Sequence, residues 1–260
     1  MIITFGNFKG GVGKTTATQL FTFLLSTFDN KKVLAVDTDP QSNLTDSLAL
    51  TFQKELDVEK NIFNACFSSD PLRDFIQPIH ENVDILAGSW DMEFFGKTAS
   101  KMYKSSFLHE ILTDKFSEVK NEYDYILVDT SPSTGIVMEN AIYATDYVVI
   151  PTKTEPMAYD STTKFYQYLL SLDDDTDFHL VGVMPYLVGD SSTDRKMLER
   201  YKEVFDEILF ENTIRASDRV KTWSNKGITT DKPYDKQTLE MYYQTVIEAI
   251  KRIESAGALT

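Results

Sequence analysis

Residues 9–16, Lys-Gly-Gly-Val-Gly-Lys-Thr-Thr, have the types and spacing of a phosphate-binding loop. The glycines at positions 10, 11 and 13 can adopt backbone angles that other residues avoid, so successive N–H groups can converge on phosphate oxygens. Lys14 supplies a positive charge for the β- and γ-phosphates, and the Thr15 hydroxyl suits Mg²⁺. We therefore expect a nucleoside triphosphate here, bound by Gly10, Gly11, Val12, Gly13, Lys14, Thr15 and Thr16.

Two apolar runs further along the chain each end in an aspartate. They are residues 32–37 (KVLAVD) and 125–129 (YILVD). Such runs are typical of buried parallel strands, whose carboxyl ends face the ligand in an open α/β sheet. The second run has the form of a Walker B segment, which predicts that Asp129 lies opposite the loop and holds Mg²⁺ directly or through water. An aspartate that merely ends a strand is the alternative.

Strand and helix signals alternate along the chain. Apolar runs predict strands at residues 2–5, 32–37, 83–87, 125–129, 147–151 and 180–184, and a short one at 213–215. Helical periodicity predicts helices at 16–28, 106–118, 135–144, 156–172, 194–209, 216–227 and 237–253, a short helix capped by Asn43 that runs through Leu48, short helices within 51–77, and a loop-rich stretch at 88–105. This order predicts an α/β fold with a doubly wound, mostly parallel sheet flanked by helices.

The length and hydrophobic content of the chain predict a single domain, and its lack of long apolar segments predicts a cytoplasmic protein. The chain has 260 residues, of which 42% are hydrophobic, so we expect a single domain over residues 1–260. The sequence has no cleavable apolar leader and no run of about 18 apolar residues, which predicts a soluble, cytoplasmic protein. Cys66 is the only cysteine, which excludes an intrachain disulfide and a cysteine-rich metal site.

Charge is distributed unevenly along this acidic chain. A formal net charge of −14 argues against a protein whose whole surface grips DNA, because nonspecific binding depends on Lys and Arg that neutralise phosphates. Residues 195–236, however, contain ten Lys and Arg against eight Asp and Glu. A locally basic face is therefore compatible with the sequence, and the acidic remainder predicts an affinity that is sensitive to salt.

Two further segments have alternatives that the residues largely exclude. The acids of residues 173–177 suggest a calcium loop, but Phe178 and Met184 stand where an EF-hand requires Gly and Glu, so a solvated loop is expected. The amphipathic helix at 237–253 suggests a membrane surface. Its polar face has few cations and includes Glu240 and Glu248, which favours docking onto the sheet.

The chain resembles the ParA-type DNA partition ATPases of the ParA/MinD superfamily from end to end. The extra lysine, Lys9, is similar to the lysine of that superfamily's deviant Walker A loop, and Phe8 stands where the general loop pattern has a glycine that partition members often lack. Residues 36–43, 123–133 and 144–151 resemble further motifs of the family. The resemblance implies a P-loop NTPase fold without a separate amino-terminal DNA-binding domain.

The resemblance also implies roles for individual residues. Lys9, Lys14 and Asp37 would be catalytic: Lys9 would reach the γ-phosphate across a homodimer, and Asp37 would orient the attacking water. Thr15, Asp129 and Asp37 would organise Mg²⁺. The base pocket would involve Met184, Pro185, Tyr186, Ile214 and Arg215, although the family's usual Ile-Pro-Arg becomes Ile-Arg-Ala at residues 214–216.

The function implied is an ATPase for plasmid or chromosome partitioning, associated with the nucleoid. In such families an ATP-bound homodimer binds nonspecific DNA, and a ParB-like centromere-binding protein stimulates hydrolysis. The candidate DNA contacts are Arg195, Arg215, Arg219 and Lys221, each of which could instead be a solvated cation.

Other functions remain as alternatives. A MinD-like positioning switch would need a cationic, aromatic terminal helix, which residues 237–260 lack. A nitrogenase-type electron carrier would need bridging cysteines, and a bacterial P-loop tyrosine kinase would need a terminal tyrosine cluster. A non-catalytic, ATP-dependent interaction protein is harder to separate, because partition ATPases turn over slowly alone.

Overall fold

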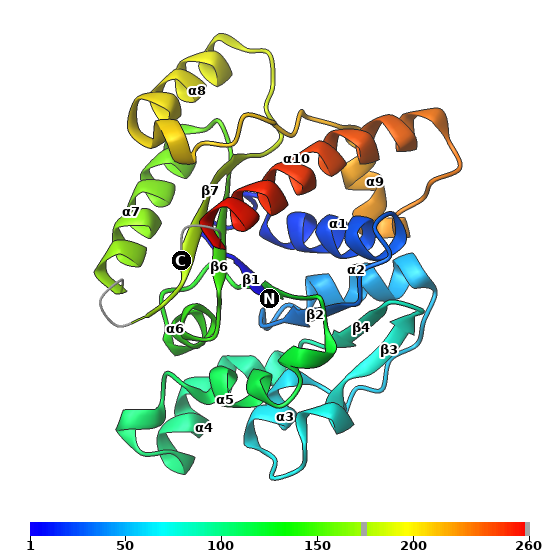
Figure 1. Cartoon of the computed structure of the whole chain (residues 1–260), viewed down its shortest axis with the longest axis vertical. Coiled ribbons are helices and arrows are strands. Elements are labelled where there is room, and N and C mark those ends of the chain that lie inside the picture. Colours follow the sequence, from blue (N-terminus) through cyan, green and yellow to red (C-terminus); the bar gives the residue numbers. More distant parts are fainter. Residues whose placement is uncertain (173–175, 258–260) are drawn as a thin grey trace.

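The computed structural model describes residues 1–172 and 176–257. Three residues of the predicted acidic loop, 173–175, therefore lie outside the described residues. Seven strands of the described residues form one sheet in the order β3-β4-β2-β5-β1-β6-β7 (Figure 1). They are β1 (Ile2–Phe5), β2 (Val33–Asp37), β3 (Gln77–His80), β4 (Val83–Leu86), β5 (Tyr125–Asp129), β6 (Tyr147–Thr152) and β7 (His179–Pro185).

All neighbouring strands are parallel except β3 and β4, which form an antiparallel pair at one edge. The sequence did not predict β3. Its alternating burial and Pro78 fit an edge strand, where a proline removes no essential ladder hydrogen bond. The predicted doubly wound, mostly parallel sheet is thus confirmed, with one antiparallel edge.

Helices cover both faces of the sheet (Figure 1). On one face lie α1 (Lys14–Thr27), α2 (Asn43–Phe52), α9 (Asp218–Lys226) and α10 (Pro233–Gly257). On the other lie α3 (Ile62–Phe67), α4 (Phe95–Met102), α5 (Ile111–Ser117), α6 (Ile136–Tyr143), α7 (Pro156–Leu172) and α8 (Ser192–Phe205).

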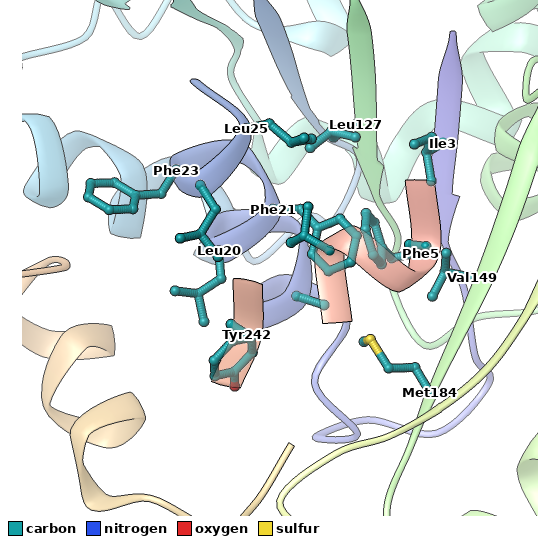
Figure 2. Packing of buried hydrophobic residues seen from close by; sticks show 14 of the residues in the cluster. Ile3, Phe5, Leu20, Phe21, Phe23, Leu25, Leu127, Val149, Met184 and Tyr242 are labelled. Atoms are coloured by element: carbon teal, nitrogen blue, oxygen red, sulfur yellow. The ribbon is translucent and has the colours of Figure 1, made fainter. Parts of the chain in front are cut away.

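Successive residues of a strand point to opposite faces of the sheet and therefore pack in different hydrophobic cores. In β6, Val148 and Ile150 pack with α7 and α8, while Val149 packs with α1. Figure 2 shows the second of these cores, where Phe5 of β1 and Phe21 of α1 meet edge to face at 5.0 Å. Tyr242 of α10 is buried in the same cluster. The apolar face of α10 is therefore docked inside the fold, as predicted.

Four local predictions need correction. The stretch at 88–105 is not mainly loop, because it contains a 3₁₀ helix (Trp90–Phe94) and α4. The helix expected at 106–118 is broken into a 3₁₀ helix (Ser105–Phe107) and α5. Residues 213–215 form only one isolated bridge, from Arg215 to Val188. Asn43 begins α2 instead of capping it, and the helix extends to Phe52.

Candidate nucleotide-binding site

The glycine-rich loop joins the end of β1 to the start of α1, and two of its glycines have left-handed backbones. Gly11 has φ 75° and Gly13 has φ 101°. A Cβ atom on Gly13 would lie 2.5 Å from the Tyr186 ring, so neither the backbone nor the space admits a side chain there. The loop therefore has the compact backbone that the sequence predicts for phosphate binding.

Lys14 is buried at the start of α1. Its Nζ donates to the carbonyl of Lys9 at 3.2 Å. Burial lowers the pKa of the Lys14 ammonium, while the nearby carboxylates of Asp129 and Asp39 act in the opposite direction. Lys14 therefore lies between the loop and the acids at the carboxyl ends of the strands. A phosphate bound by the loop would lie beside its ammonium group.

The side chain of Lys9 has a different environment. Lys9 is half-exposed, and among the described residues its ammonium makes no hydrogen bond or ion pair. Its backbone N–H is fixed by a hydrogen bond of 3.0 Å to Oδ1 of Asn7. The loop therefore presents Lys9 with a fixed backbone and a free charge.

Asp129 ends β5 and is fully buried. Neither of its carboxylate oxygens accepts a hydrogen bond from the described residues. Burial, and then the charge of Asp37, raise the pKa of Asp129 well above its usual value, while Thr15 and Lys14 partly oppose this. A buried carboxylate without hydrogen bonds is costly unless a cation compensates it, so Asp129 fits a metal ligand.

Asp37 ends β2 and pairs in register with Asp129. Its Oδ2 accepts from the backbone N–H of Thr45 at 2.9 Å and from the Thr45 hydroxyl at 2.8 Å, and its Oδ1 accepts from the N–H of Asp39 at 3.1 Å. Burial nevertheless raises the pKa of Asp37 to about 6. Because Thr45 lies in the first turn of α2, Asp37 satisfies a free helix donor there, which explains why Asn43 is not needed as the cap.

The described residues contain no cluster of three or more His, Cys, Asp or Glu side chains that could enclose a metal. The arrangement of Thr15 and Asp129 suits Mg²⁺, which is usually bound through one or two protein ligands together with phosphate oxygens and water. The donor set therefore fits a metal that arrives with a nucleotide.

The residues predicted to contact the base have unequal access. Met184 and Ile214 are fully buried in the core with α1 and α10 (Figure 2 for Met184). The carbonyl of Pro185 accepts from the backbone N–H of Ile214 at 3.0 Å. Tyr186 is buried against the loop and its hydroxyl donates to Thr16 at 3.3 Å. Only Arg215 is largely exposed, and it pairs with Asp190 at 3.3 Å.

The four predicted DNA contacts also divide into two groups. Arg195 and Arg215 are exposed and both reach Asp190, and Lys221 is an exposed residue that pairs with Asp218 at 3.5 Å. Arg219, in contrast, is mostly buried.

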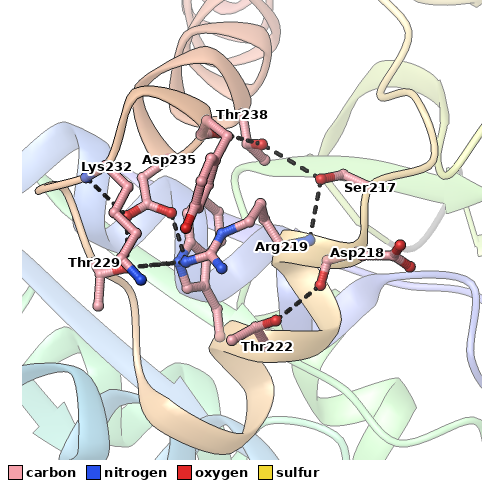
Figure 3. A network of polar contacts seen from close by, with 10 residues as sticks. Ser217, Asp218, Arg219, Thr222, Thr229, Lys232, Asp235 and Thr238 are labelled. Atoms are coloured by element: carbon pink, nitrogen blue, oxygen red, sulfur yellow. Dashed lines mark hydrogen bonds and ion pairs between the residues drawn. The ribbon is translucent and has the colours of Figure 1, made fainter.

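Arg219 belongs to a polar network between α9 and α10 (Figure 3). Its guanidinium pairs at 2.6 Å with Asp235, which is fully buried, and stacks on the ring of Tyr234 at 4.6 Å. It also donates to the Thr229 hydroxyl at 3.3 Å. The positive charge of Arg219 is therefore compensated within the fold by the carboxylate of Asp235.

Two residues at the site were not singled out from the sequence. Asn7 is a fully buried polar residue that follows the first apolar run, and Thr45 lies in α2. The position of Asn7 between an apolar strand and the glycine-rich loop was a signal that could have been used. No local pattern marks Thr45, because its partner Asp37 is met only in the folded chain.

Comparisons with known proteins agree with this geometry. A family model described as an AAA domain matches residues 1–181. The chain is similar to a virulence plasmid ParA family protein, pGP5-D, of Chlamydia muridarum, with 29% identity over 215 residues that cover 82% of this chain and 78% of the relative.

Two solved structures share the fold. One is an ATP complex of a McdA variant from Cyanothece, with a TM-score of 0.84, 22% identity and 96% of both chains covered. The other is cobyrinic acid a,c-diamide synthase from Mycobacterium smegmatis with a bound ATP analogue and magnesium, with a TM-score of 0.73, 22% identity, and coverage of 86% of this chain and 91% of the other.

Proposed function

The chain belongs to this AAA-domain family and, within it, to the ParA-type ATPases of the ParA/MinD superfamily, and from this membership we propose a Mg²⁺-dependent ATPase that partitions plasmid or chromosomal DNA. The observation that carries the proposal is the pair of buried aspartates, Asp37 and Asp129. They lie in register at the carboxyl ends of two neighbouring inner strands, beside Lys14. One continuous sheet through the described residues supports treating residues 1–260 as a single ATPase domain.

The residues of the site divide the work of phosphoryl transfer. The loop amides and Lys14 hold the phosphates, while Thr15 and Asp129 bind Mg²⁺, which supplies positive charge to the phosphate oxygens. A carboxylate has about four acceptor positions, and Asp37 uses three of them within the fold. The remaining position, on Oδ1, is enough to orient one water molecule for attack.

The environment of Lys9 supports a site completed by two subunits. Its ammonium has no partner among the described residues, although its backbone is fixed. In an ATP-bound homodimer, Lys9 would stabilise charge on the nucleotide of the other subunit. Nucleotide binding would then favour formation of the homodimer.

The dimer would bind nonspecific DNA and a ParB-like centromere-binding protein, and DNA binding would place it on the nucleoid. The exposed cations Arg195, Arg215 and Lys221 are the better candidates for phosphate contacts, because Arg219 is mostly buried and pairs with the buried Asp235. We propose no membrane partner. None of the helices in the described residues combines the length and apolar composition of a membrane span, and the apolar face of α10 is buried.

Two measurements test the proposal. Filter binding of random-sequence duplex DNA at low salt should show affinity with Mg²⁺ and ATP that is lost with ADP, without nucleotide, or as salt is raised. Phosphate release from ATP should need Mg²⁺ and should be strongly reduced in Asp37→Ala. An affinity for DNA that is the same with ATP, with ADP and without nucleotide would overturn the proposed ATP-dependent DNA binding. Equal phosphate release by wild type and Asp37→Ala would remove Asp37 from the mechanism and favour a non-catalytic interaction protein.

A further inference from the structure

The start of the phosphate loop is anchored to α7 by three consecutive residues. A Cβ atom on Gly6 would lie 2.5 Å from the Phe165 ring, so the absence of a side chain lets α7 approach the backbone closely. The ring of Phe8 packs edge to face on Phe165 at 4.9 Å and lies 5.3 Å from Tyr168. Phe8, the departure from the general loop pattern, therefore works as an apolar anchor that a glycine could not provide.

Asn7, between these two residues, makes the polar part of the anchor. Its Nδ2 donates to the carbonyl of Pro151 and to the hydroxyl of Thr162, both at 2.9 Å. Its Oδ1 accepts from the backbone N–H of Lys9 at 3.0 Å and from the hydroxyl of Ser161 at 3.1 Å. Asn7 is fully buried, and both donors and both acceptor positions of its amide are used.

Only one of these four bonds reaches into the glycine-rich loop. The other three tie Asn7 to the end of β6 and to α7, and from Thr162 the network continues through the hydroxyl of Thr152 to that of Tyr201 on α8. The bond to Lys9 is therefore held by a rigid, fully satisfied set of neighbours. The backbone of Lys9 is held on both sides of its Cα atom, because its N–H donates to Asn7 and its carbonyl accepts from Lys14.

We infer that Asn7 is a positioning residue for hydrolysis, which fixes the backbone of Lys9 so that the Lys9 ammonium is presented in one direction from the loop. This inference rests on the proposed role of Lys9 in completing a second subunit's site. Asn7 makes no hydrogen bond to the predicted phosphate-binding residues 10–15, and its only link to Lys14 runs through the backbone of Lys9, so we expect its loss to lower turnover much more than the affinity for nucleotide.

The first experiment compares Asn7→Ala with Thr162→Val. Thr162→Val removes one bond on the donor side of the Asn7 amide and leaves Oδ1 with Lys9. With Mg²⁺, ATP and random-sequence duplex DNA, Asn7→Ala should lower kcat roughly ten- to hundredfold with KM within about twofold, while Thr162→Val should keep kcat. Equal losses of kcat in both variants would mean that Asn7 only stabilises the fold, and would overturn the inference.

A second comparison tests the route through Lys9. In a Lys9→Ala background, Asn7→Ala should cause no further loss of kcat, because the two changes remove one contribution. Asn7→Asp, which keeps the acceptor for Lys9 and loses both donors, should retain kcat even if it is less stable than Asn7→Ala. Additive losses, or a lower kcat for Asn7→Asp than for Asn7→Ala, would contradict the inference.

Amide hydrogen exchange separates this inference from the proposed function. In nucleotide-free protein, the Lys9 amide should exchange at least about tenfold faster in Asn7→Ala than in wild type, while the Gly11 amide changes little. A wild-type protein without ATPase activity would overturn the proposed function, yet this exchange result would still report whether Asn7 holds Lys9. Unchanged exchange at Lys9 would overturn the inference whatever the ATPase activity.

Discussion

Asp37 and Asp129 occupy paired positions on β2 and β5, yet their buried carboxylates have opposite surroundings. Asp37 accepts three hydrogen bonds from Thr45 and Asp39, whereas Asp129 accepts none from the described residues. Asp37 is therefore hydrogen-bonded to the start of α2, whereas Asp129 has oxygens available to bind a cation. This division makes the two acids separable by mutation.

Asp129→Asn should stabilise the metal-free protein, and more so at higher pH. The folded protein raises the pKa of Asp129, so the folded state binds more protons than the unfolded chain above about pH 4. Its contribution to stability is lost as pH rises from the unfolded toward the folded pKa. Thermal unfolding in EDTA should show a Tm gain for Asp129→Asn that is larger at pH 8 than at pH 5.

The matched control for that measurement is Asp231→Asn, which changes an exposed acid outside the site. It should shift Tm by a similar small amount at both pH values. A gain for Asp129→Asn that does not depend on pH would contradict a raised pKa for the buried carboxyl group of Asp129.

Lys9→Ala and Lys14→Ala should separate hydrolysis from binding. Lys14 is buried between the loop and Asp129, so its loss should weaken ATP binding roughly ten- to hundredfold, in line with a hydrogen bond to a charged group. Lys9→Ala should keep appreciable ATP binding and lose dimer-dependent turnover by roughly a hundredfold. Titration with a fluorescent ATP analogue and measurement of phosphate release distinguish the two; variants that bind and hydrolyse alike would disprove this division.

Gly13→Ala should damage the loop through both backbone and packing. The left-handed φ of 101° costs about 1–3 kcal/mol for a residue with a side chain, and the new Cβ would clash with Tyr186. We expect a lower Tm and weak ATP binding. Gly135→Ala is the control, because a Cβ there meets no atom within 4 Å. Tyr186→Ala should relieve the clash in Gly13→Ala without restoring full binding, since the backbone cost persists.

Arg219→Ala should behave as a stability variant, not a DNA-binding variant. It would leave the buried carboxylate of Asp235 with only the Thr229 hydroxyl and the Lys232 N–H as partners, which should cost about 1–3 kcal/mol. Arg195→Ala, at an exposed position, should leave the midpoint of chemical denaturation unchanged and reduce the salt dependence of DNA binding by roughly one phosphate contact. If Arg219→Ala kept full stability and lost DNA affinity, the assignment would have to be reversed.

The sequence predicted the parts of the site that depend on local pattern. The glycine spacing predicted the phosphate loop, and the runs that end in Asp37 and Asp129 predicted two strands that meet at one edge of the sheet. These signals are strong because buried parallel strands are nearly continuous apolar runs and because few residues other than glycine tolerate the loop backbone.

The remaining parts depend on partners that are distant in sequence. Asp37 needs Thr45 from the next helix, Asn7 needs Thr162, and Arg219 needs Asp235. A buried polar side chain must find a hydrogen-bonding partner, but its sequence position does not say which. Arg219 looked like a surface cation for this reason. Edge strand β3 was missed because four residues with a proline carry little strand signal.

The position of β1 in the middle of the sheet has a consequence for biosynthesis. Its two neighbours are β5 and β6, so Phe5 pairs with Asp129 on one side and Val149 on the other. During translation, the first strand and its glycine-rich loop must wait for more than a hundred residues before either neighbour exists. At about 5–20 residues per second that wait is on the order of ten seconds. A nascent chain that ends before β5 therefore lacks Asp129 as well as both neighbours of β1, however early the loop leaves the ribosome.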